Sequence, residues 1–565
     1  MNGSPLRAAA LAALLLFTPI GSSGCILAQE SNEARRVDEI FAEWDHTSSP
    51  GCALGVIRDG EFVYRRGYGM ASLELGVPLS SESVLYIGST SKQFVSASIL
   101  LAEEQGFLSL DDDIRKYLPE IPEYENTITV RNLLHHTSGL RDYLTLWALA
   151  GESIEDIHSV DDALDMIARQ KALNFLPGEE YLYSNSGYFL LSVIVERATG
   201  KSLPEFSQAN IFEPLGMENT HFHDDHTHII PNRAIGHLRR DDGSVALNMS
   251  NFSQVGSGGL YTSVDDLLLW DRNFYDNELG EGGLIDRMQV RGVLNNGDTL
   301  SYAAALVIGE YRGLRTVEHG GALGGYRAQL LRFPDQRFSV VCLCNYAPTN
   351  PGQLANRVAD VYLADQFIEI EELGEETPET RAAPDLIELP EGQLAAFNGA
   401  YRNPETGTIW RVEAEGHRLN IDIGGFVFQL DAVSPNEFTV LNQPFEADAR
   451  FVTDAPGGFK RIEAVINGDS ASYHQVELVD PSADVLAEYS GDYYSAELAV
   501  TWTLEVREGA LYVNLEQDEP LEPTVKDEFV LQGVTLMFIR NTSGTVSGIE
   551  VDAGRVKGLV FEKRP

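Results

Sequence analysis

An internal repeat in the last third of the chain is the feature that most constrains its fold. The segment LAAFNGAY at residues 394–401 is echoed by LAEYSGDY at residues 486–493, and the same spacing matches Trp410 with Trp502. The match continues without gaps, and each copy contains short alternating strands separated by turn residues. Because self-similarity at a fixed spacing indicates duplicated structural units, we expect two small antiparallel β-barrels here.

The part of the chain before the repeat mixes strands and helices. Strand patterns occupy residues 52–57, 61–68 and 327–344. Helical patterns occupy residues 91–105, 160–170, 188–198 and 264–276. Since strands come first and last with helices between them, we expect an antiparallel sheet closed by both ends of the domain and flanked by a helical subdomain.

These patterns define the expected organisation of the chain. An α+β domain covers residues 29–367, and an acidic, proline-containing linker follows at residues 368–391. The two barrel domains, lipocalin-like in architecture, are expected at residues 392–482 and 483–565.

The charge of the chain excludes some partners. Among 565 residues, 85 are acidic and 41 are basic, which gives a formal net charge of -44 at pH 7. A surface of this sign repels nucleic acid and anionic membranes, so neither is expected as a partner.

The N-terminus is typical of an export signal. Arg7 provides a positive start, residues 8–17 form a short apolar run, and small residues lead to a cleavage position near Ala28. We expect residues 1–28 to be a signal peptide and the protein to be periplasmic or secreted. Alternatively Cys25 carries a lipid anchor, although Ser22 stands where a lipidation signal prefers a bulky aliphatic residue.

The cysteines do not suggest a disulfide framework. The chain has four, and Cys25 is removed with the signal or carries lipid. Cys342 and Cys344 alternate in an apolar strand, so their side chains share one face. We expect these two and Cys52 to be buried thiols.

Ser89 and Lys92 offer a nucleophile and a base on one helical turn. Residues three apart on a helix are neighbours, and the apolar run that follows Lys92 predicts a buried helix. Ser89 at the helix N-terminus would lie where backbone N–H groups favour developing negative charge. Lys92, surrounded by apolar side chains, would be held neutral and would accept the serine proton.

Two further motifs carry polar chemistry. In Tyr183-Ser184-Asn185 a tyrosine can relay a proton and an asparagine can bind a substrate carbonyl. The sequence His319-Gly320-Gly321-Ala322 opens a predicted strand, where glycines allow close approach of a substrate. The N–H of Ala322 would pair with that of Ser89 as an oxyanion hole, and His319 would donate towards Tyr183 or a substrate carboxylate.

The order of these motifs resembles the serine β-lactamase and penicillin-binding-protein superfamily, in its class C-like branch with esterases and D-aminopeptidases. The residues concerned are 89–92, 183–185 and 319–321, with further similar stretches at 133–140, 214–217 and 258–263. The resemblance covers residues 35–365. β-Lactamases of this class carry lysine at the position of His319. A histidine there looks like the D-aminopeptidase-type members, which also append two β-barrels.

The resemblance implies acyl transfer that needs no cofactor and no metal. Ser89 attacks the carbonyl, Lys92 takes its proton, the Ser89 and Ala322 amides hold the oxyanion, and Tyr183 passes a proton to the leaving group. Lys92 and Tyr183 stay open as alternatives for the base. The remaining substrate-binding candidates are Asn185, His319, Gly320 and Gly321.

The expected substrates are D-amino-acid amides or short peptides, with ester hydrolysis or weak β-lactamase activity as the runner-up. In the D-aminopeptidase-type members a barrel loop reaches the cleft and helps to read the free amine of the substrate. The sequence does not place that loop here, and it does not predict an oligomeric state.

Two other hypotheses remain. Residues 221–228 contain H-x-H-x-D-H, a zinc signature of metallo-β-lactamase-like hydrolases, but it follows a polar turn rather than a buried strand. The other hypothesis is a non-catalytic, penicillin-recognising sensor or scaffold. This second hypothesis is disfavoured because the chain contains all three of Ser89, Lys92 and Tyr183.

Overall fold

The structure is a computed structural model. It describes residues 32–153, 156–367, 386–404, 406–423, 426–440, 447–453, 460–466, 469–515 and 519–565. The expected signal peptide and most of the expected linker lie outside the described residues. Within these ranges, no helix combines the length and the apolar character needed to cross a membrane.

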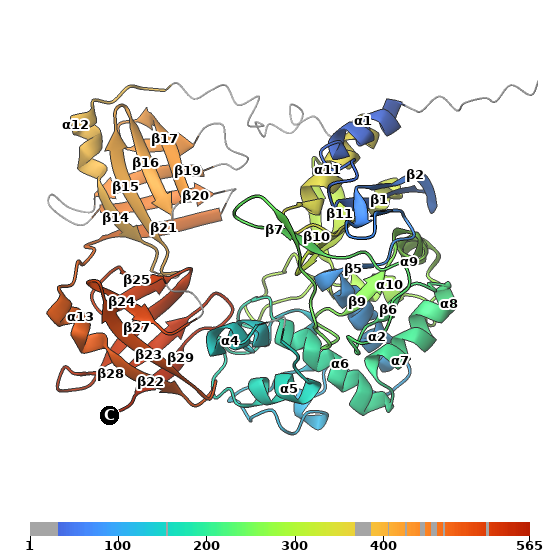
Figure 1. Cartoon of the computed structure of the whole chain (residues 1–565), viewed down its shortest axis with the longest axis horizontal. Coiled ribbons are helices and arrows are strands. Elements are labelled where there is room, and N and C mark those ends of the chain that lie inside the picture. The colour runs from blue at the N-terminus through green and yellow to red at the C-terminus, as the bar shows by residue number, and fades with distance from the viewer. Residues whose placement is uncertain are drawn as a thin grey trace, which may run out of the picture.

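A six-stranded antiparallel sheet forms the centre of the first domain, in the order β10-β11-β12-β13-β1-β2 (Figure 1). Its strands are β1 (Cys52–Arg58), β2 (Glu61–Tyr68), β10 (Val307–Tyr311), β11 (Leu314–Leu323), β12 (Tyr326–Phe333) and β13 (Phe338–Cys344). The first strand lies beside the last, because β1 pairs with β13 in antiparallel register. The expected sheet, closed by both ends of the domain, is confirmed.

Residues 327–344, predicted as one strand, form a hairpin of two. A 3₁₀ turn, Pro334–Gln336, separates β12 from β13, and Arg337 completes the reversal with a φ of 47°. Both strands are almost wholly buried, so neither shows the alternation that marks separate half-exposed strands. Pro334, which lacks an N–H for the sheet, is the sequence signal of this break.

Helices cover both faces of the sheet. They are α1 (Asn32–Phe41), α2 (Lys92–Glu104), α3 (Val130–Leu134), α4 (Tyr143–Ala150), α5 (Val160–Ala168), α6 (Asn185–Thr199), α7 (Leu203–Ser207), α8 (Glu213–Leu215), α9 (Val264–Asp276), α10 (Leu284–Met288) and α11 (Pro351–Tyr362). Leu54 and Val56 of β1 pack in the core with α1 and α11, whereas Ala53 and Ile57 belong to the core of the helical subdomain. The side chains of one strand therefore serve two layers.

Short strands complete the first domain. They are β3 (Met70–Ser72), β4 (Val77–Pro78), β5 (Leu85–Tyr86), β6 (His221–Phe222), β7 (His237–Arg239), β8 (Val245–Leu247) and β9 (Leu260–Thr262). Strands β5, β9 and β6 form a small sheet, and β5 leads directly to the segment that carries Ser89.

The repeat forms two closed eight-stranded antiparallel barrels, which lie one above the other beside the first domain (Figure 1). Barrel 1 consists of β14 (Gly399–Arg402), β15 (Ile409–Glu415), β16 (Arg418–Ile423), β17 (Phe426–Ser434), β18 (Glu437–Val440), β19 (Ala447–Thr453), β20 (Lys460–Ile466) and β21 (Asp469–Val476). Barrel 2 consists of β22 (Gly491–Ser495), β23 (Val500–Arg507), β24 (Ala510–Val513), β25 (Pro520–Pro523), β26 (Glu528–Leu531), β27 (Val534–Arg540), β28 (Val546–Asp552) and β29 (Leu559–Lys563). A short helix lies just before each barrel, α12 (Glu391–Leu394) and α13 (Ala483–Tyr489).

The repeated residues have the same place in both barrels. Tyr401 lies opposite Trp410 in barrel 1, as Tyr493 lies opposite Trp502 in barrel 2. Each tyrosine hydroxyl donates to the backbone carbonyl four residues before it. The expected duplication is therefore a duplication of strand register as well as of sequence.

In the part of the chain that the structure describes, barrel 2 shares a hydrophobic core with the first domain and barrel 1 does not. Trp502, Leu504 and other residues inside barrel 2 belong to the same buried cluster as α2 and α6, whereas barrel 1 has a cluster of its own. The indole N–H of Trp502 donates to the Leu149 carbonyl at 3.0 Å. Barrel 2 is thus docked against the helical subdomain, and barrel 1 is joined to barrel 2 by contacts such as the Arg402–Glu528 ion pair.

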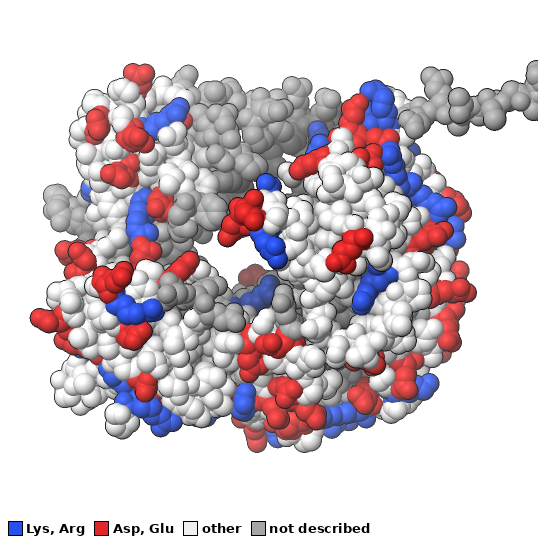
Figure 2. Space-filling view, in the orientation of Figure 1, with Lys and Arg blue, Asp and Glu red and all other residues white. Residues whose placement is uncertain are grey.

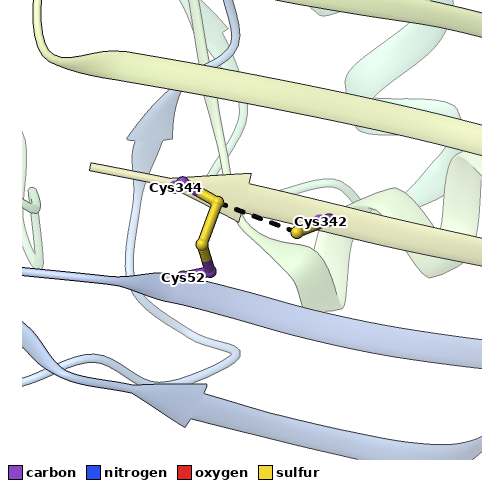
Figure 3. A group of neighbouring side chains, drawn as sticks. All are labelled: Cys52, Cys342 and Cys344. Carbon is purple, nitrogen blue, oxygen red and sulfur yellow. Dashed lines mark hydrogen bonds between the residues drawn. A yellow bond between two sulfur atoms is a disulfide. The ribbon is translucent and has the colours of Figure 1, made fainter. Parts of the chain in front are cut away.

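The expectation of three buried thiols is wrong for two of them. Cys52 and Cys344 form a disulfide between β1 and β13, and Cys342 is a buried free thiol 3.7 Å from Cys344 Sγ (Figure 3). Cys52 lies directly opposite Cys344 in the register of the two strands. The sequence shows the alternation of Cys342 and Cys344, but not which residue of a distant strand faces them.

Candidate active site

Ser89 lies on a 3₁₀ turn, η1 (Gly88–Ser91), that continues into α2. Lys92 is the first residue of α2 and is fully buried. Its Nζ lies 3.1 Å from Ser89 Oγ and 3.0 Å from Asn185 Oδ1, and it also donates to the backbone carbonyl of Ser257. The predicted nucleophile and base are therefore in contact, with Ser89 one turn ahead of the helix rather than within it.

Burial changes the charge state of Lys92. Its surroundings lower the pKa of the amine to about 7, because removal from water disfavours the ammonium form. The charge of Asp142 opposes this effect and that of Arg555 adds to it. A large fraction of Lys92 is consequently neutral near pH 7 and able to accept a proton.

Tyr183 and Asn185 lie on the opposite wall, at the start of α6. The Tyr183 ring centroid is 5.0 Å from Lys92 Nζ, and its buried hydroxyl lies beside Ser89 without a hydrogen bond of normal geometry among the described residues. Burial raises the pKa of Tyr183 well above its usual value of 10.0. The backbone N–H of Asn185 donates to Asp142 Oδ2, and the side-chain Oδ1 of Asn185 accepts from Lys92.

His319, Gly320, Gly321 and Ala322 lie near the end of β11, not at the beginning of a strand as expected. Strand β10 pairs with β11 only as far as Glu318, which leaves this segment as an edge. The edge faces η1, where the Thr90 hydroxyl donates to the His319 carbonyl at 3.3 Å. The sequence predicted that the glycines let a substrate come close to this strand. In the structure, the turn that carries Ser89 comes close to them.

Two glycines bring the Ser89 and Ala322 amides together. A Cβ on Gly88, whose φ is 53°, would lie 2.5 Å from the Ala322 nitrogen. A Cβ on Gly321 would lie 1.9 Å from the Ile87 carbonyl oxygen and 2.9 Å from the Ser89 nitrogen. Only glycine fits at either position, because any side chain would push the two backbones apart.

His319 does not offer the donor that the sequence suggested. Its Nδ1 is 2.6 Å from the Gly320 carbonyl, which can only accept, so Nδ1 carries the proton. Its Nε2, 3.1 Å from the Tyr302 hydroxyl, then accepts. Burial and the charge of Lys92 lower the pKa of His319 to about 4, so the ring is neutral at pH 7 and has no free N–H for Tyr183 or a substrate.

These groups line a cleft of about 550 Å³. Ser89, Tyr183, Asn185, His319 and the glycines all contribute to its wall. Sequence reasoning missed three participants, Ser257, Tyr302 and Arg555. The glycine-rich stretch around Ser257 was a signal for the first. For Arg555, which comes from barrel 2, the resemblance implied a barrel loop at the cleft, but nothing in the sequence placed that loop at residue 555.

The histidine-rich segment does not form a comparable site. His221 Nε2 and His223 Nδ1 are 3.3 Å apart, but the His228 ring centroid is 6.0 Å from that of His221. In the described part of the chain, the one group with three ligand atoms close enough to share a metal ion is Cys52, Cys342 and Cys344. Two of those sulfurs are joined in the disulfide, so this group does not fit a metal ion.

Comparisons with known proteins agree with this architecture. The family model described as Beta-lactamase matches residues 36–364. A D-aminopeptidase from Brucella anthropi is 30% identical over 464 residues, which cover 80% of this chain and 83% of the relative. A D-aminopeptidase from Cereibacter sphaeroides is 28% identical over 521 residues, covering 89% of this chain and 93% of the relative.

Solved structures share the fold. An octameric penicillin-binding protein homologue from Pyrococcus abyssi has a TM-score of 0.54 and 21% identity, and covers 78% of this chain and 99% of its own. The D-amino acid amidase from Ochrobactrum anthropi SV3 has a TM-score of 0.51 and 20% identity, and covers 60% of this chain and 100% of its own. With a family model that spans more than half of its length, the chain belongs to the β-lactamase family and is a serine hydrolase of that family.

Proposed function

We propose that the protein hydrolyses amide bonds of small substrates through an acyl-enzyme on Ser89, and that its substrates are D-amino-acid amides or short peptides with a D-residue. The relatives named D-aminopeptidase support this substrate class. The mechanistic part of the proposal rests on the hydrogen bonds of Lys92.

A neutral lysine amine has two N–H groups and one lone pair. The Asn185 Oδ1 and the Ser257 carbonyl accept hydrogen bonds and take the two N–H groups. The lone pair is then left for Ser89 Oγ, at 3.1 Å. This arrangement supports Lys92 as the base, since burial keeps Tyr183 protonated and therefore unable to act as one.

The reaction follows from these positions. Ser89 Oγ attacks the substrate carbonyl as its proton moves to Lys92, and the Ser89 and Ala322 amides stabilise the tetrahedral oxyanion. The C–N bond then breaks, and the leaving amine gains a proton through the Tyr183 hydroxyl, which Lys92 replenishes. Water then attacks the ester on Ser89. Its proton passes back through Tyr183 and Lys92 to Ser89 Oγ, and the acid is released.

Hydrolysis of D- and L-alanine p-nitroanilide tests the proposal. We expect turnover of the D-form that Ser89→Ala abolishes. Ser184→Ala is the matched control, because this nearby buried hydroxyl makes no hydrogen bond among the described residues. Equal rates in wild type and Ser89→Ala would refute the mechanism, and preference for the L-form would refute the substrate class.

We further propose that the protein is exported. The Cys52–Cys344 disulfide supports this, because such bonds persist in oxidising compartments. N-terminal sequencing of protein from the periplasm or medium should find a chain that begins near residue 29. A lipid-modified chain that begins at Cys25 would indicate anchoring instead, and an intact N-terminus in the cytoplasm would contradict export.

A further inference from the structure

Arg555 enters the catalytic cleft from barrel 2. It lies in the turn between β28 and β29, and the backbone carbonyl of Arg555 accepts hydrogen bonds from the Asp142 N–H and the Asn174 side chain. Two residues on, Arg141 donates to the carbonyl of Lys557. The backbone of the loop is thus bound to the first domain at residues 555 and 557, and this docking holds Arg555 at the cleft.

The guanidinium of Arg555 lies over the Tyr183 ring and has no hydrogen-bond acceptor among the described residues. Its Cζ lies 4.7 Å from the centroid of the Tyr183 ring, and the side chain is exposed in the cleft. Within the described ranges it has neither a carboxylate partner nor a side-chain hydrogen bond. Arg327, the other arginine of the cleft, donates instead to the carbonyls of Gly324 and Tyr326.

The cleft is positive in a strongly acidic protein. None of the described residues that line it is acidic, although the chain carries a net charge of -44. Figure 2 shows a hollow between the barrels and the first domain, with both basic and acidic side chains along its rim. His319 is neutral and internally bonded, whereas Arg555 is a cation over the Tyr183 ring whose N–H groups have no acceptor within the described ranges.

The position over Tyr183 indicates which part of a substrate meets this charge. The Tyr183 hydroxyl lies beside Ser89, where the leaving nitrogen of a bound amide would sit. In a peptide, the carboxylate of a C-terminal leaving residue is only two bonds from that nitrogen. A planar guanidinium recognises a carboxylate with paired hydrogen bonds.

We propose that Arg555 binds the free C-terminal carboxylate of the leaving residue, so that short peptides are preferred over simple amides. This assignment rests on the proposed function and narrows its substrate class. Arg555 is then a specificity determinant supplied by another domain.

The test compares D-alanyl-glycine with D-alanyl-glycinamide, which differ only in the terminal carboxylate. In the wild type we expect kcat/KM to be about 10- to 100-fold higher for the free acid, as for one charge-assisted hydrogen bond. Arg555→Gln should remove this preference, and Arg555→Lys should restore part of it. Lys557→Gln, which removes a cation two residues away outside the cleft lining, should retain it.

Equal rates for the two peptides in the wild type, or an unchanged preference in Arg555→Gln, would overturn the assignment while D-alanine p-nitroanilide turnover still upheld the proposed function. If no substrate shows Ser89-dependent turnover, the proposed function fails, and the role of Arg555 is then tested by measuring peptide binding. Calorimetric titration of Ser89→Ala with D-alanyl-glycine should then show affinity that Arg555→Gln weakens at least tenfold. Equal affinity of Ser89→Ala and of the double variant Ser89→Ala/Arg555→Gln would overturn the assignment of Arg555.

Discussion

The chemistry of the site depends on how single side chains are buried. Among the described residues Lys92 makes no ion pair with a carboxylate, and two carbonyl-type oxygens hold it, so the neutral amine is well accommodated. Tyr183 and His319 are also kept neutral by burial. The identities of these residues could be predicted from the sequence because their motifs are local. Their protonation states could not, since these depend on groups distant in the chain, such as Asp142 and Arg555.

The acid limb of activity should follow Lys92. Because the neutral amine is the active form, kcat/KM for p-nitrophenyl acetate should rise with pH through about 7. Arg555→Gln removes a charge that lowers the pKa of Lys92, so the midpoint should move to higher pH. Asp142→Asn removes a charge that raises it, so the midpoint should move to lower pH. Shifts in the same direction, or none, would contradict the role of Lys92.

Gly88→Ala should disable the oxyanion hole. The added Cβ would press against the Ala322 nitrogen, so we expect kcat to fall by about 10²- to 10³-fold, as when an oxyanion donor is lost. Gly106→Ala is the matched control, since Gly106 also has a positive φ, 79°, but open space at its Cβ. Steady-state kinetics of both variants provide the measurement, and equal kcat values in the two would contradict the assignment.

At the scale of elements, the sequence predicted local periodicity better than pairing. The helix expected at residues 264–276 is α9, with the same bounds. The strand expected at 327–344 is a hairpin, and the His319 motif ends a strand rather than opening one. Both errors concern how strands reverse and pair, which depends on contacts across the sheet rather than on a repeating pattern.

The disulfide between β1 and β13 should stabilise the sheet. It joins residues 292 positions apart, so it restricts the unfolded chain strongly, and its loss should cost about 2–4 kcal/mol. Thermal unfolding of Cys52→Ser, or of reduced wild type, should occur at a lower temperature than that of the oxidised protein. Cys342→Ala, which leaves the bond intact, should respond to reductant as the wild type does. An unfolding temperature indifferent to reductant would contradict this prediction.

At the scale of the whole molecule, barrel 2 is a structural part of the catalytic cleft. Arg141 and Glu497 form an almost fully buried ion pair at 2.8 Å between the two domains, and Arg141 also holds the loop of Arg555. The sequence predicted the barrels from their repeat. The family resemblance implied that a barrel loop reaches the cleft, but the sequence could not predict which loop or which residue, because domain docking leaves no periodic signal in the chain.

Glu497→Gln should weaken this docking. It leaves the Arg141 charge buried without its partner, which typically costs about 3–5 kcal/mol. The exposed Lys557–Glu180 pair is the control, and Lys557→Gln should cost less than about 1 kcal/mol. Urea unfolding measures both variants, and equal stability of the two would contradict a central role for the buried pair.

The identity of the nucleophile is the central claim, and mass spectrometry of a quenched reaction tests it most directly. The protein is mixed with p-nitrophenyl acetate, quenched in acid during turnover, and digested. The mechanism predicts an acetyl group on the peptide that contains Ser89, and no such group in Ser89→Ala. An acetyl group on another residue, or turnover without any acetylated peptide, would contradict the account.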